Sequence, residues 1–176
     1  MEFFEAVKKR YSYRGKYRSS PVARGDLQKI LEAGLAAPSG CNTQTTSCIG
    51  LDDPELIRSV GTLIKSSAVT VAPAAICVLT QRKPGYADVY FNVQDYAAAI
   101  ENMLLAITAL GYASCWIEGQ VTGDPKIPAE IGRLLNIPPE YSVVAYLPVG
   151  VAEGEGKRPR YKPFAERAWF NGFGKN

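Results

Sequence analysis

The stretch that decides the fold is Asp95-Tyr96-Ala97-Ala98-Ala99-Ile100-Glu101-Asn102-Met103-Leu104-Leu105. It belongs to the longest predicted helix, which runs from about Val89 to Gly111. Apolar residues cover most of the circumference of this helix, so the pattern predicts a central helix that is buried on nearly all sides. Gly111 is expected to end the helix, because glycine readily adopts the left-handed conformation found at helix ends.

Shorter helices and strands are predicted on both sides of this central helix. Apolar spacing and the positions of proline predict helices over Glu2–Lys9, from about Asp26 to just before Pro38, over Pro54–Lys65 and over Asp124–Asn136. Strands are predicted over Thr45–Leu51, Ala74–Thr80, Ala113–Ile117 and Ser142–Val149. The order lacks the regular alternation of a doubly wound fold. We therefore expect an α+β sandwich with four or five strands flanked by helices.

The size and composition of the chain predict one domain. The chain has 176 residues, of which 47% are hydrophobic and 21% charged, and it shows no internal repeat. We therefore assign residues 1–176 to a single domain. The segment 152–176 differs in composition, because it is rich in Gly, Lys, Arg and Pro and yet carries Phe164, Trp169, Phe170 and Phe173. These rings predict a C-terminal arm that packs on another surface, such as a second subunit.

Charge and hydropathy favour a soluble protein of the cytoplasm. The net charge of +3 is too small to indicate nucleic-acid binding by itself. The first residues lack the basic start and apolar core of a secretion signal. The longest uncharged apolar run, Asn102 to Ile117, falls short of the roughly 20 residues that cross a bilayer. We expect no membrane contact.

The absence of histidine removes several kinds of chemistry. With no histidine in the chain, catalytic systems that pair serine or cysteine with histidine are excluded, as are metal sites with imidazole ligands. The four cysteines show no C-x-x-C spacing and are expected to be reduced structural thiols. No dinucleotide-binding glycine motif follows a strand, and the segment 154–158 fails the P-loop pattern at Arg158. We expect no bound metal.

A polar loop follows the second predicted helix. It reads Ala37-Pro38-Ser39-Gly40-Cys41-Asn42-Thr43-Gln44 and combines turn formers with small hydrogen-bonding side chains. Such a set suits recognition of a polar heteroaromatic ring. An ordinary polar loop after a helix terminator has the same composition.

Two arginine pairs lie near the ends of the chain. Arg10, Ser12 and Arg14 are spaced two apart, so in an extended segment they point the same way and can converge on one phosphate. Arg158 and Arg160 repeat this spacing around a proline. Each pair is also compatible with a solvated basic surface. Together they suggest a clamp for a monophosphate.

Taken over its full length, the chain resembles the FMN-dependent nitroreductase family. The resemblance rests on four motifs in the order of that family: Arg10-x-Ser12-x-Arg14, the loop Ala37 to Gln44, the helix Asp95 to Leu105 leading to Gly111, and Trp116-Ile117-Glu118-Gly119. It implies a three-layer α-β-α sandwich around a central mixed, mainly antiparallel sheet. It also implies a homodimer that holds FMN at the subunit interface.

The resemblance further assigns residues to the cofactor. Three groups of one subunit would bind the flavin phosphate, ribityl chain and ring: Arg10, Ser12 and Arg14; the turn Ile117, Glu118 and Gly119 through its backbone N–H groups; and Arg158 and Arg160, with Lys157 and Lys162 as competitors. The partner subunit would contribute Pro38, Ser39, Asn42 and Gln44. No catalytic side chain is assigned, because the flavin carries the chemistry.

The implied activity is transfer of hydride from NAD(P)H through FMN to a flat acceptor such as a nitroaromatic or a quinone, in a ping-pong scheme. The insert that forms a lid in larger relatives is short here, from about Gln81 to Asn92. Within it, Tyr86, Tyr90 and Phe91 are candidate rings over the site, although packing elsewhere explains each equally well. The sequence does not distinguish this enzyme from a non-catalytic flavin-binding or flavin-sensing protein. A remote alternative is a nucleic-acid-binding module that uses the basic and aromatic residues of segment 8–18.

Overall fold

A small antiparallel sheet lies at the centre of the computed structural model, which describes residues 1–66, 69 and 71–175. Within these residues the sheet has three strands in the order β1 (Thr46–Leu51), β2 (Ala74–Thr80) and β3 (Ser142–Val149), and both pairings are antiparallel. Every residue of β2 is buried, since this strand has a neighbour on each edge and helices on both faces. This burial explains its unbroken apolar sequence.

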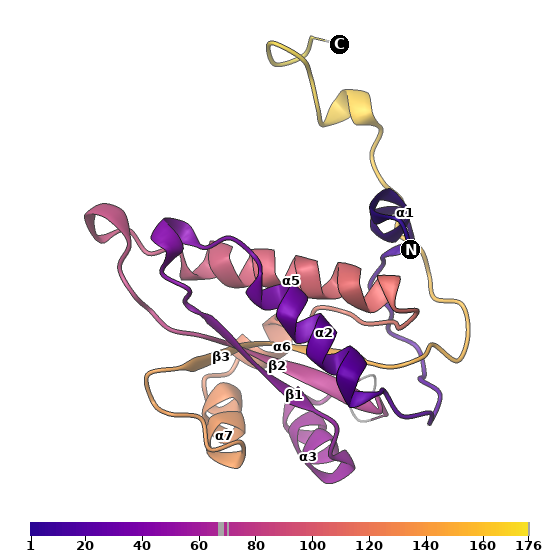
Figure 1. Cartoon of the computed structure of the whole chain (residues 1–176), viewed down its shortest axis with the longest axis vertical. Helices are drawn as coiled ribbons and strands as arrows, with labels where there is room; N and C mark the ends of the chain where they lie inside the picture. Colours follow the sequence, from indigo (N-terminus) through magenta and orange to yellow (C-terminus); the bar gives the residue numbers. More distant parts are fainter. Residues whose placement is uncertain (67–68, 70, 176) are drawn as a thin grey trace.

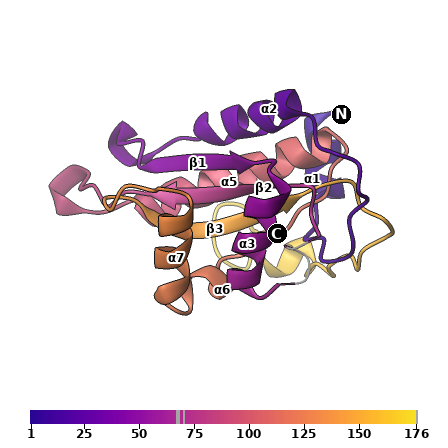
Figure 2. The same ribbon diagram turned by 90° about the horizontal axis from the view of Figure 1, so that it is seen from below.

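Helices cover both faces of the sheet (Figures 1 and 2). Helices α2 (Arg24–Leu35) and α5 (Asn92–Ala109) share one core with alternate residues of β2 such as Ile76 and Val78. The opposite core joins Cys77 and Leu79 to α3 (Pro54–Ile64), α6 (Gly119–Thr122) and α7 (Lys126–Leu134). The alternation of side chains along a strand thus divides the interior into two layers.

The central helix α5 is buried on one side only. Its inner side carries Tyr96, Ile100, Met103 and Ile107, all of which are buried. The opposite side is half-buried around Ala97, Ala98 and Leu105 and exposed at Glu101. The prediction of burial on nearly all sides is therefore wrong for the isolated chain. The helix ends at Ala109, shortly before Gly111, which has a φ of 85°.

The predicted strand Ala113–Ile117 does not form as a continuous strand. Instead its residues make isolated bridges to two segments: Ala113 to Gly150 and Ile117 to Tyr146, along β3 and its end, and Ser114 to Ser12 of the N-terminal segment. The two bridges to β3 share one antiparallel register, but Pro148, which lies between Tyr146 and Gly150, has no N–H to donate, so no continuous ladder develops. The expectation of four or five strands is wrong for the residues that the structure describes, and so is that of a mixed sheet. The bridge between Ser12 and Ser114 is parallel, but it stands alone.

The other predicted helices and strands are confirmed to within a few residues at their ends. Helix α3 begins at Pro54, and the Asp53 side chain caps it by accepting hydrogen bonds from the backbone N–H groups of Glu55 and Leu56. Helix α2 begins at Arg24, two residues before the predicted start at Asp26. No helix within the described residues is long and apolar enough to cross a membrane.

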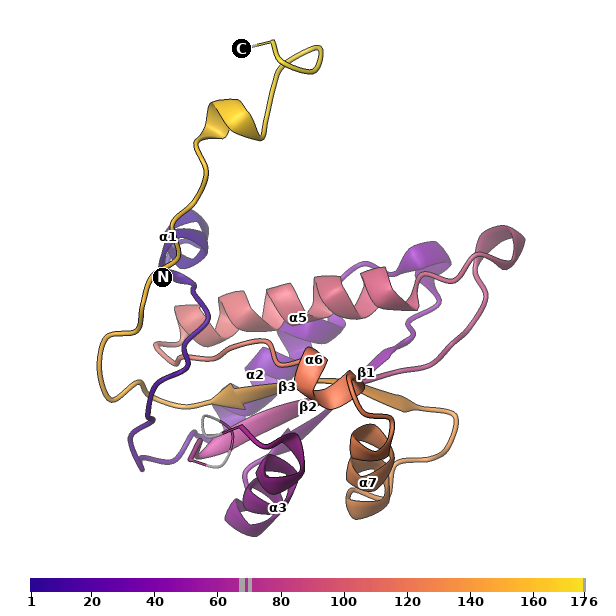
Figure 3. The ribbon, with the colours of Figure 1, turned by 180° about the vertical axis from the view of Figure 1, so that it is seen from behind.

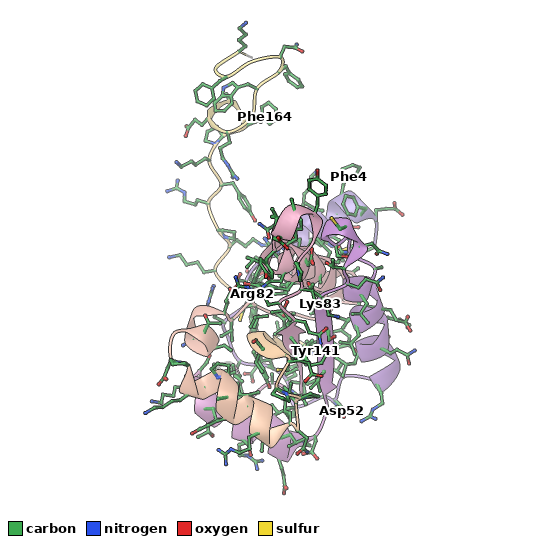
Figure 4. The ribbon with its side chains drawn as sticks, turned by 90° about the vertical axis from the view of Figure 1, so that its left-hand side faces the viewer. Phe4, Asp52, Arg82, Lys83, Tyr141 and Phe164 are labelled. Atoms are coloured by element: carbon green, nitrogen blue, oxygen red, sulfur yellow. The ribbon has the colours of Figure 1, made fainter. Side chains whose placement is uncertain are left out.

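The two chain ends expose large aromatic side chains. Helix α1 (Phe3–Lys9) leaves Phe4 76% exposed. Beyond about residue 156 the chain leaves the body as an arm, with a short helical turn at Phe164–Glu166 (Figures 1 and 4). On this arm Trp169 and Phe173 pack on each other with ring centroids 4.1 Å apart. Asn176, the last residue of the predicted arm, lies outside the described residues.

The cysteines differ sharply in accessibility. Burial raises the pKa of the Cys115 thiol to about 11 and those of Cys48 and Cys77 to about 12, whereas Cys41 is exposed. We expect only Cys41 to react quickly with a disulfide reagent at about pH 8, because the thiolate is the reactive form. All four thiols should react in denaturant. Rapid reaction of two or more thiols in the folded protein would contradict this packing.

Candidate functional site

The two arginine pairs meet at one groove. The groove has a volume of about 800 Å³, and its lining includes Arg10, Ser12 and Arg14 from the N-terminal segment and Arg158 and Arg160 from the start of the arm. Segments from the two ends of the chain thus lie side by side, as Figure 3 also shows. The predicted convergence of these two motifs is a feature of the structure.

Tyr11 joins the two halves of this groove. The Arg158 guanidinium lies 5.0 Å from the centroid of the Tyr11 ring, and the backbone N–H of Gly156 donates a 3.2 Å hydrogen bond to the Tyr11 hydroxyl. A side chain on Gly156 would begin 2.6 Å from the Tyr11 ring, so the close approach requires glycine. Tyr11 therefore sets where the arm begins and supports Arg158.

The lining of the groove is strongly cationic. It includes one carboxylate, Glu155, against five cationic side chains, namely Arg10, Arg14, Lys157, Arg158 and Arg160. Arg10 Nε also lies 3.4 Å from Glu101 Oε1, and the Glu101 side chain is half exposed. The lining contains Lys157 and not Lys162, so of these two competitors Lys157 is the one placed for the same ligand. Guanidinium groups in such an arrangement suit a phosphate.

A nearly extended segment links the groove to a turn that offers backbone N–H groups. Its start is held to the N-terminal segment, because the Tyr13 N–H donates to the Ser114 carbonyl at 2.8 Å. Four residues on, Glu118 is the N-cap residue directly before helix α6. An extended backbone covers about 3.3 Å per residue, which places the turn about 13 Å from Ser114. Groove and turn thus lie at separate points along one potential binding surface.

Within the turn, only two of the three predicted N–H groups are available. The Ile117 N–H donates to the Tyr146 carbonyl at 3.1 Å, so the assignment of Ile117 to the cofactor is corrected. In the described part of the chain, the N–H groups of Glu118 and Gly119 have no acceptor. Apart from its chain neighbours and the backbone of α6, no atom of the described residues lies within 4 Å of where a Gly119 side chain would begin. Glu118 and Gly119 can therefore donate to a ligand that approaches closely.

The Glu118 carboxylate is held by a buried tyrosine of α5. The Tyr96 hydroxyl donates a 2.8 Å hydrogen bond to Glu118 Oε1, and Tyr96 is only 5% exposed. Burial, the hydrogen bond to Glu118 and the charge of that carboxylate raise the pKa of Tyr96 to about 12. The hydroxyl thus keeps its proton at neutral pH and remains a donor.

The polar loop after α2 has an unusual backbone. Cys41, Asn42 and Gln44 have φ values of 52°, 53° and 48°, which residues other than glycine seldom adopt. The Gln44 N–H donates to Ser39 Oγ at 3.1 Å, and the Asn42 and Gln44 side chains lie 3.3 Å apart at the surface. A strained and exposed set of amides is a common feature of binding loops.

A buried carboxylate of α5 fixes this loop. Asp95 is 3% exposed and accepts two hydrogen bonds, from the Gly40 N–H at 2.8 Å and from Thr45 Oγ1 at 2.6 Å. Phe91, one turn earlier, packs its ring on Gly40, since a side chain on Gly40 would begin 2.3 Å from that ring. Asp95 in the first turn of α5 and Phe91 directly before this helix thus both hold the loop in place.

The short lid forms a hairpin at the same end of the molecule. Phe91 packs on both Gly40 and Gly85, so this ring has the packing role that was the alternative to stacking over the site. Tyr90 lies under the Arg82 guanidinium at 4.4 Å, and Tyr86 is 79% exposed at the tip. Figure 4, which views the molecule from the end where this hairpin lies, labels Arg82.

The loop and the groove lie at opposite ends of α5. The loop is anchored at Asp95, whereas Arg10 lies beside Glu101 and shares a small pocket with Leu104 and Thr108. Figures 1 and 3 show the loop and the hairpin on the side away from α1 and the arm. Since α5 has 18 residues at about 1.5 Å each, it extends for about 27 Å. One chain therefore does not bring the predicted loop to its own groove.

The antiparallel sheet with helices on both faces places the chain in the α+β class, and the cationic groove is its candidate binding site. A sequence profile of the nitroreductase family matches residues 7–70 and 61–151. The chain belongs to the nitroreductase family. It is 29% identical over 175 residues to a protein of Methanothermobacter thermautotrophicus and 31% identical over 140 residues to one of Archaeoglobus fulgidus, both named NADH dehydrogenase/NAD(P)H nitroreductase. These matches cover 93% and 79% of this chain and 84% and 79% of the relatives.

A solved structure has the same fold. The FMN-dependent nitroreductase of Clostridium difficile R20291 superposes with a TM-score of 0.80 at 28% identity, covering 97% of this chain and 99% of that one. The likeness thus extends over nearly the whole of both chains. It agrees with the family assignment from sequence.

Sequence reasoning missed three residues of this site. Tyr11 supports Arg158, Asp95 anchors the loop, and Tyr96 holds Glu118. Asp95 offered a signal, because a carboxylate near the start of an otherwise apolar helix needs a partner when it is buried. The two tyrosines offered none, since aromatic residues at such positions usually pack in the core.

Proposed function

We propose that the protein is an FMN-dependent oxidoreductase that uses NAD(P)H to reduce flat acceptors such as nitroaromatics or quinones. The observation that carries this proposal is the convergence of Arg10, Ser12, Arg14, Arg158 and Arg160 on one groove. The names of the relatives, which include NAD(P)H and FMN, support the choice of both molecules. When bound, the flavin would supply the chemistry, by accepting hydride from NAD(P)H and passing electrons to the acceptor in a ping-pong scheme.

The residues present fit such a cofactor. The groove offers cationic donors for the phosphate, and Ser12 offers a half-buried hydroxyl beside them. The free N–H groups of Glu118 and Gly119 would bind the polar edge of the ring and stabilise negative charge there. In this assignment the chain binds and orients the cofactor, and protons come from solvent.

We also propose a homodimer in which each site is built from two chains. Pro38, Ser39, Asn42 and Gln44 lie at the far end of α5 from their own groove, so they would serve the groove of the partner subunit. The half-buried outer side of α5 and the exposed rings of α1 and the arm 152–176 would be covered in the same assembly. Tyr86 and Tyr90 would then lie near the partner's cofactor.

The test of this function is the visible spectrum of the purified protein, recorded before and after addition of NADH or NADPH without air. We expect a flavin spectrum that bleaches on addition and returns when a quinone is added. A colourless protein that fails to take up FMN would overturn the proposal. Uptake of FMN without bleaching would instead favour the non-catalytic flavin-binding alternative.

The nucleic-acid alternative loses its stacking residues. Tyr13 is 2% exposed and Tyr17 7% exposed, so neither ring of segment 8–18 is available to a base. Tyr11, the third ring, already lies beneath Arg158. The basic residues of this segment serve the groove better than they serve a nucleic-acid surface.

A further inference from the structure

The Glu118 carboxylate raises an electrostatic problem for the proposed site. It belongs to the turn whose N–H groups would bind the ring, and an ionised carboxylate beside the ring opposes the gain of electrons there. In the described part of the chain, no lysine or arginine forms an ion pair with it. Its one hydrogen-bond partner within those residues is the Tyr96 hydroxyl. The position in which this hydroxyl holds the carboxylate therefore determines the electric field beside the ring.

We propose that Tyr96 is a positioning residue that fixes the Glu118 carboxylate on the α5 side of the turn and thereby raises the reduction potential of the bound flavin. This inference rests on the proposed function. It deepens that function by naming a residue that would determine which acceptors the enzyme can reduce. Tyr96 acts through Glu118, and no contact between Tyr96 and the flavin is required.

Tyr96 is a rigid donor. Its ring belongs to the main core together with Ile100, Val78 and Ala145, so the hydroxyl has little freedom to move. A buried donor at 2.8 Å from a carboxylate forms a charge-assisted hydrogen bond that draws negative charge toward itself. A flexible surface residue would not fix the carboxylate in one direction.

The backbone of Glu118 is held from the other side. Its carbonyl accepts hydrogen bonds from the N–H groups of Val121 and Thr122 at 2.8 Å each, and from Thr122 Oγ1 at 3.1 Å. Glu118 thus connects α5 through its side chain with α6 through its backbone. Loss of the Tyr96 hydroxyl would release the side chain and loosen the first turn of α6.

The chain offers a matched control. The Tyr112 hydroxyl donates a 3.0 Å hydrogen bond to Asp26 Oδ2, which is also a tyrosine–carboxylate pair. That pair joins the segment after α5 to α2, and its hydroxyl makes no bond to Glu118 or α6. The Tyr112 ring lines a small pocket beside Arg10 and Tyr11, so Tyr112→Phe keeps this ring and removes only the hydroxyl that bonds to α2.

The first experiment needs no flavin. Amide hydrogen exchange is measured on the apoprotein of the unmodified chain, Tyr96→Phe and Tyr112→Phe. We expect the amides of Val121 and Thr122 to exchange faster in Tyr96→Phe alone, because their acceptor is less firmly held. Equal exchange in all three proteins would show that Tyr96 does not hold the turn, and would overturn the inference whatever the cofactor.

The second experiment measures the midpoint potential of bound FMN with reference dyes. Tyr96→Phe should shift the equilibrium toward the oxidised form by about tenfold, which for a two-electron couple is about 30 mV more negative. Glu118→Gln should shift it the opposite way, and adding Tyr96→Phe to Glu118→Gln should have no further effect. Tyr112→Phe should leave the potential unchanged.

The outcomes separate the two proposals. FMN binding with an unchanged potential in Tyr96→Phe would overturn the role of Tyr96 and leave the proposed function intact. An equal shift in the Glu118→Gln background would also overturn it, because Tyr96 would then act without the carboxylate. Failure of the unmodified protein to bind FMN would overturn the proposed function. The exchange experiment, which needs no flavin, would still show whether Tyr96 holds the turn in place.

Discussion

Replacing Arg14 and Arg158 together with alanine is expected to weaken FMN binding by about 3–6 kcal/mol, since a hydrogen bond to a charged group contributes about 1.5–3 kcal/mol. The corresponding loss in affinity is between about 10² and 10⁴-fold. The two side chains approach the groove from opposite ends of the chain, and the structure pairs neither with a carboxylate in its described part. Each single variant, like Arg10→Ala, should lose about half of this free energy.

The binding is measured by the quenching of FMN fluorescence at fixed ionic strength, because salt screens such contacts. Arg58→Ala is the control, since Arg58 is exposed on α3, on the other side of the sheet. It should bind FMN as the unmodified chain does. Arg14→Lys should lose less than Arg14→Ala, because lysine keeps the charge but not the fork of donors. If the double variant retained full affinity, the groove would not be the phosphate site.

Replacing Asp95 with alanine is expected to lower the free energy of unfolding by about 2–4 kcal/mol, because two buried donors lose their acceptor. These donors are the Gly40 N–H and the Thr45 hydroxyl. The variant should also weaken FMN binding, since the loop that carries Asn42 and Gln44 loses its anchor. Unfolding in urea measures the first effect and fluorescence quenching the second.

Asp124→Ala is a suitable comparison for Asp95→Ala. The Asp124 carboxylate also accepts a backbone N–H, that of Lys126 at 3.0 Å, but it does so at the surface. Its loss should cost about 1 kcal/mol or less, as for an ordinary helix cap. A loss of stability in Asp95→Ala no larger than that of Asp124→Ala would show that Asp95 does not anchor the loop.

Local patterns predicted much of this fold because the chain follows them closely. The apolar run Ala74–Thr80 predicted strand β2, and Pro54 marked the start of α3. The segment Ala113–Ile117 has the composition of a strand and lies along β3, but Pro148 of β3 interrupts the pairing, and local sequence does not reveal which residue lies opposite. The outer side of α5 is apolar without a cover in the single chain, which accords with the proposed dimer.

Sequence was informative about the candidate site where residues form short motifs, and it was silent where they act across the fold. Spacing identified the arginine pairs, and the structure brings them to one groove. The hydrogen bonds from Gly40 to Asp95 and from Tyr96 to Glu118 join segments that are far apart in sequence. The contact of Phe91 with Gly40 was not predicted for the same reason, since it depends on the position of α5.

The most direct test of the account is the FMN content of a dimer built from two different variants. One chain carries Arg14→Ala and Arg158→Ala, the other carries Asn42→Ala and Gln44→Ala, and two affinity tags allow the mixed dimer to be purified after coexpression. Each variant alone should bind FMN poorly. In the mixed dimer, the groove of the second chain and the loop of the first form an intact site, so we predict about one FMN per dimer. A mixed dimer that binds no more FMN than its parents would contradict a site shared between two chains.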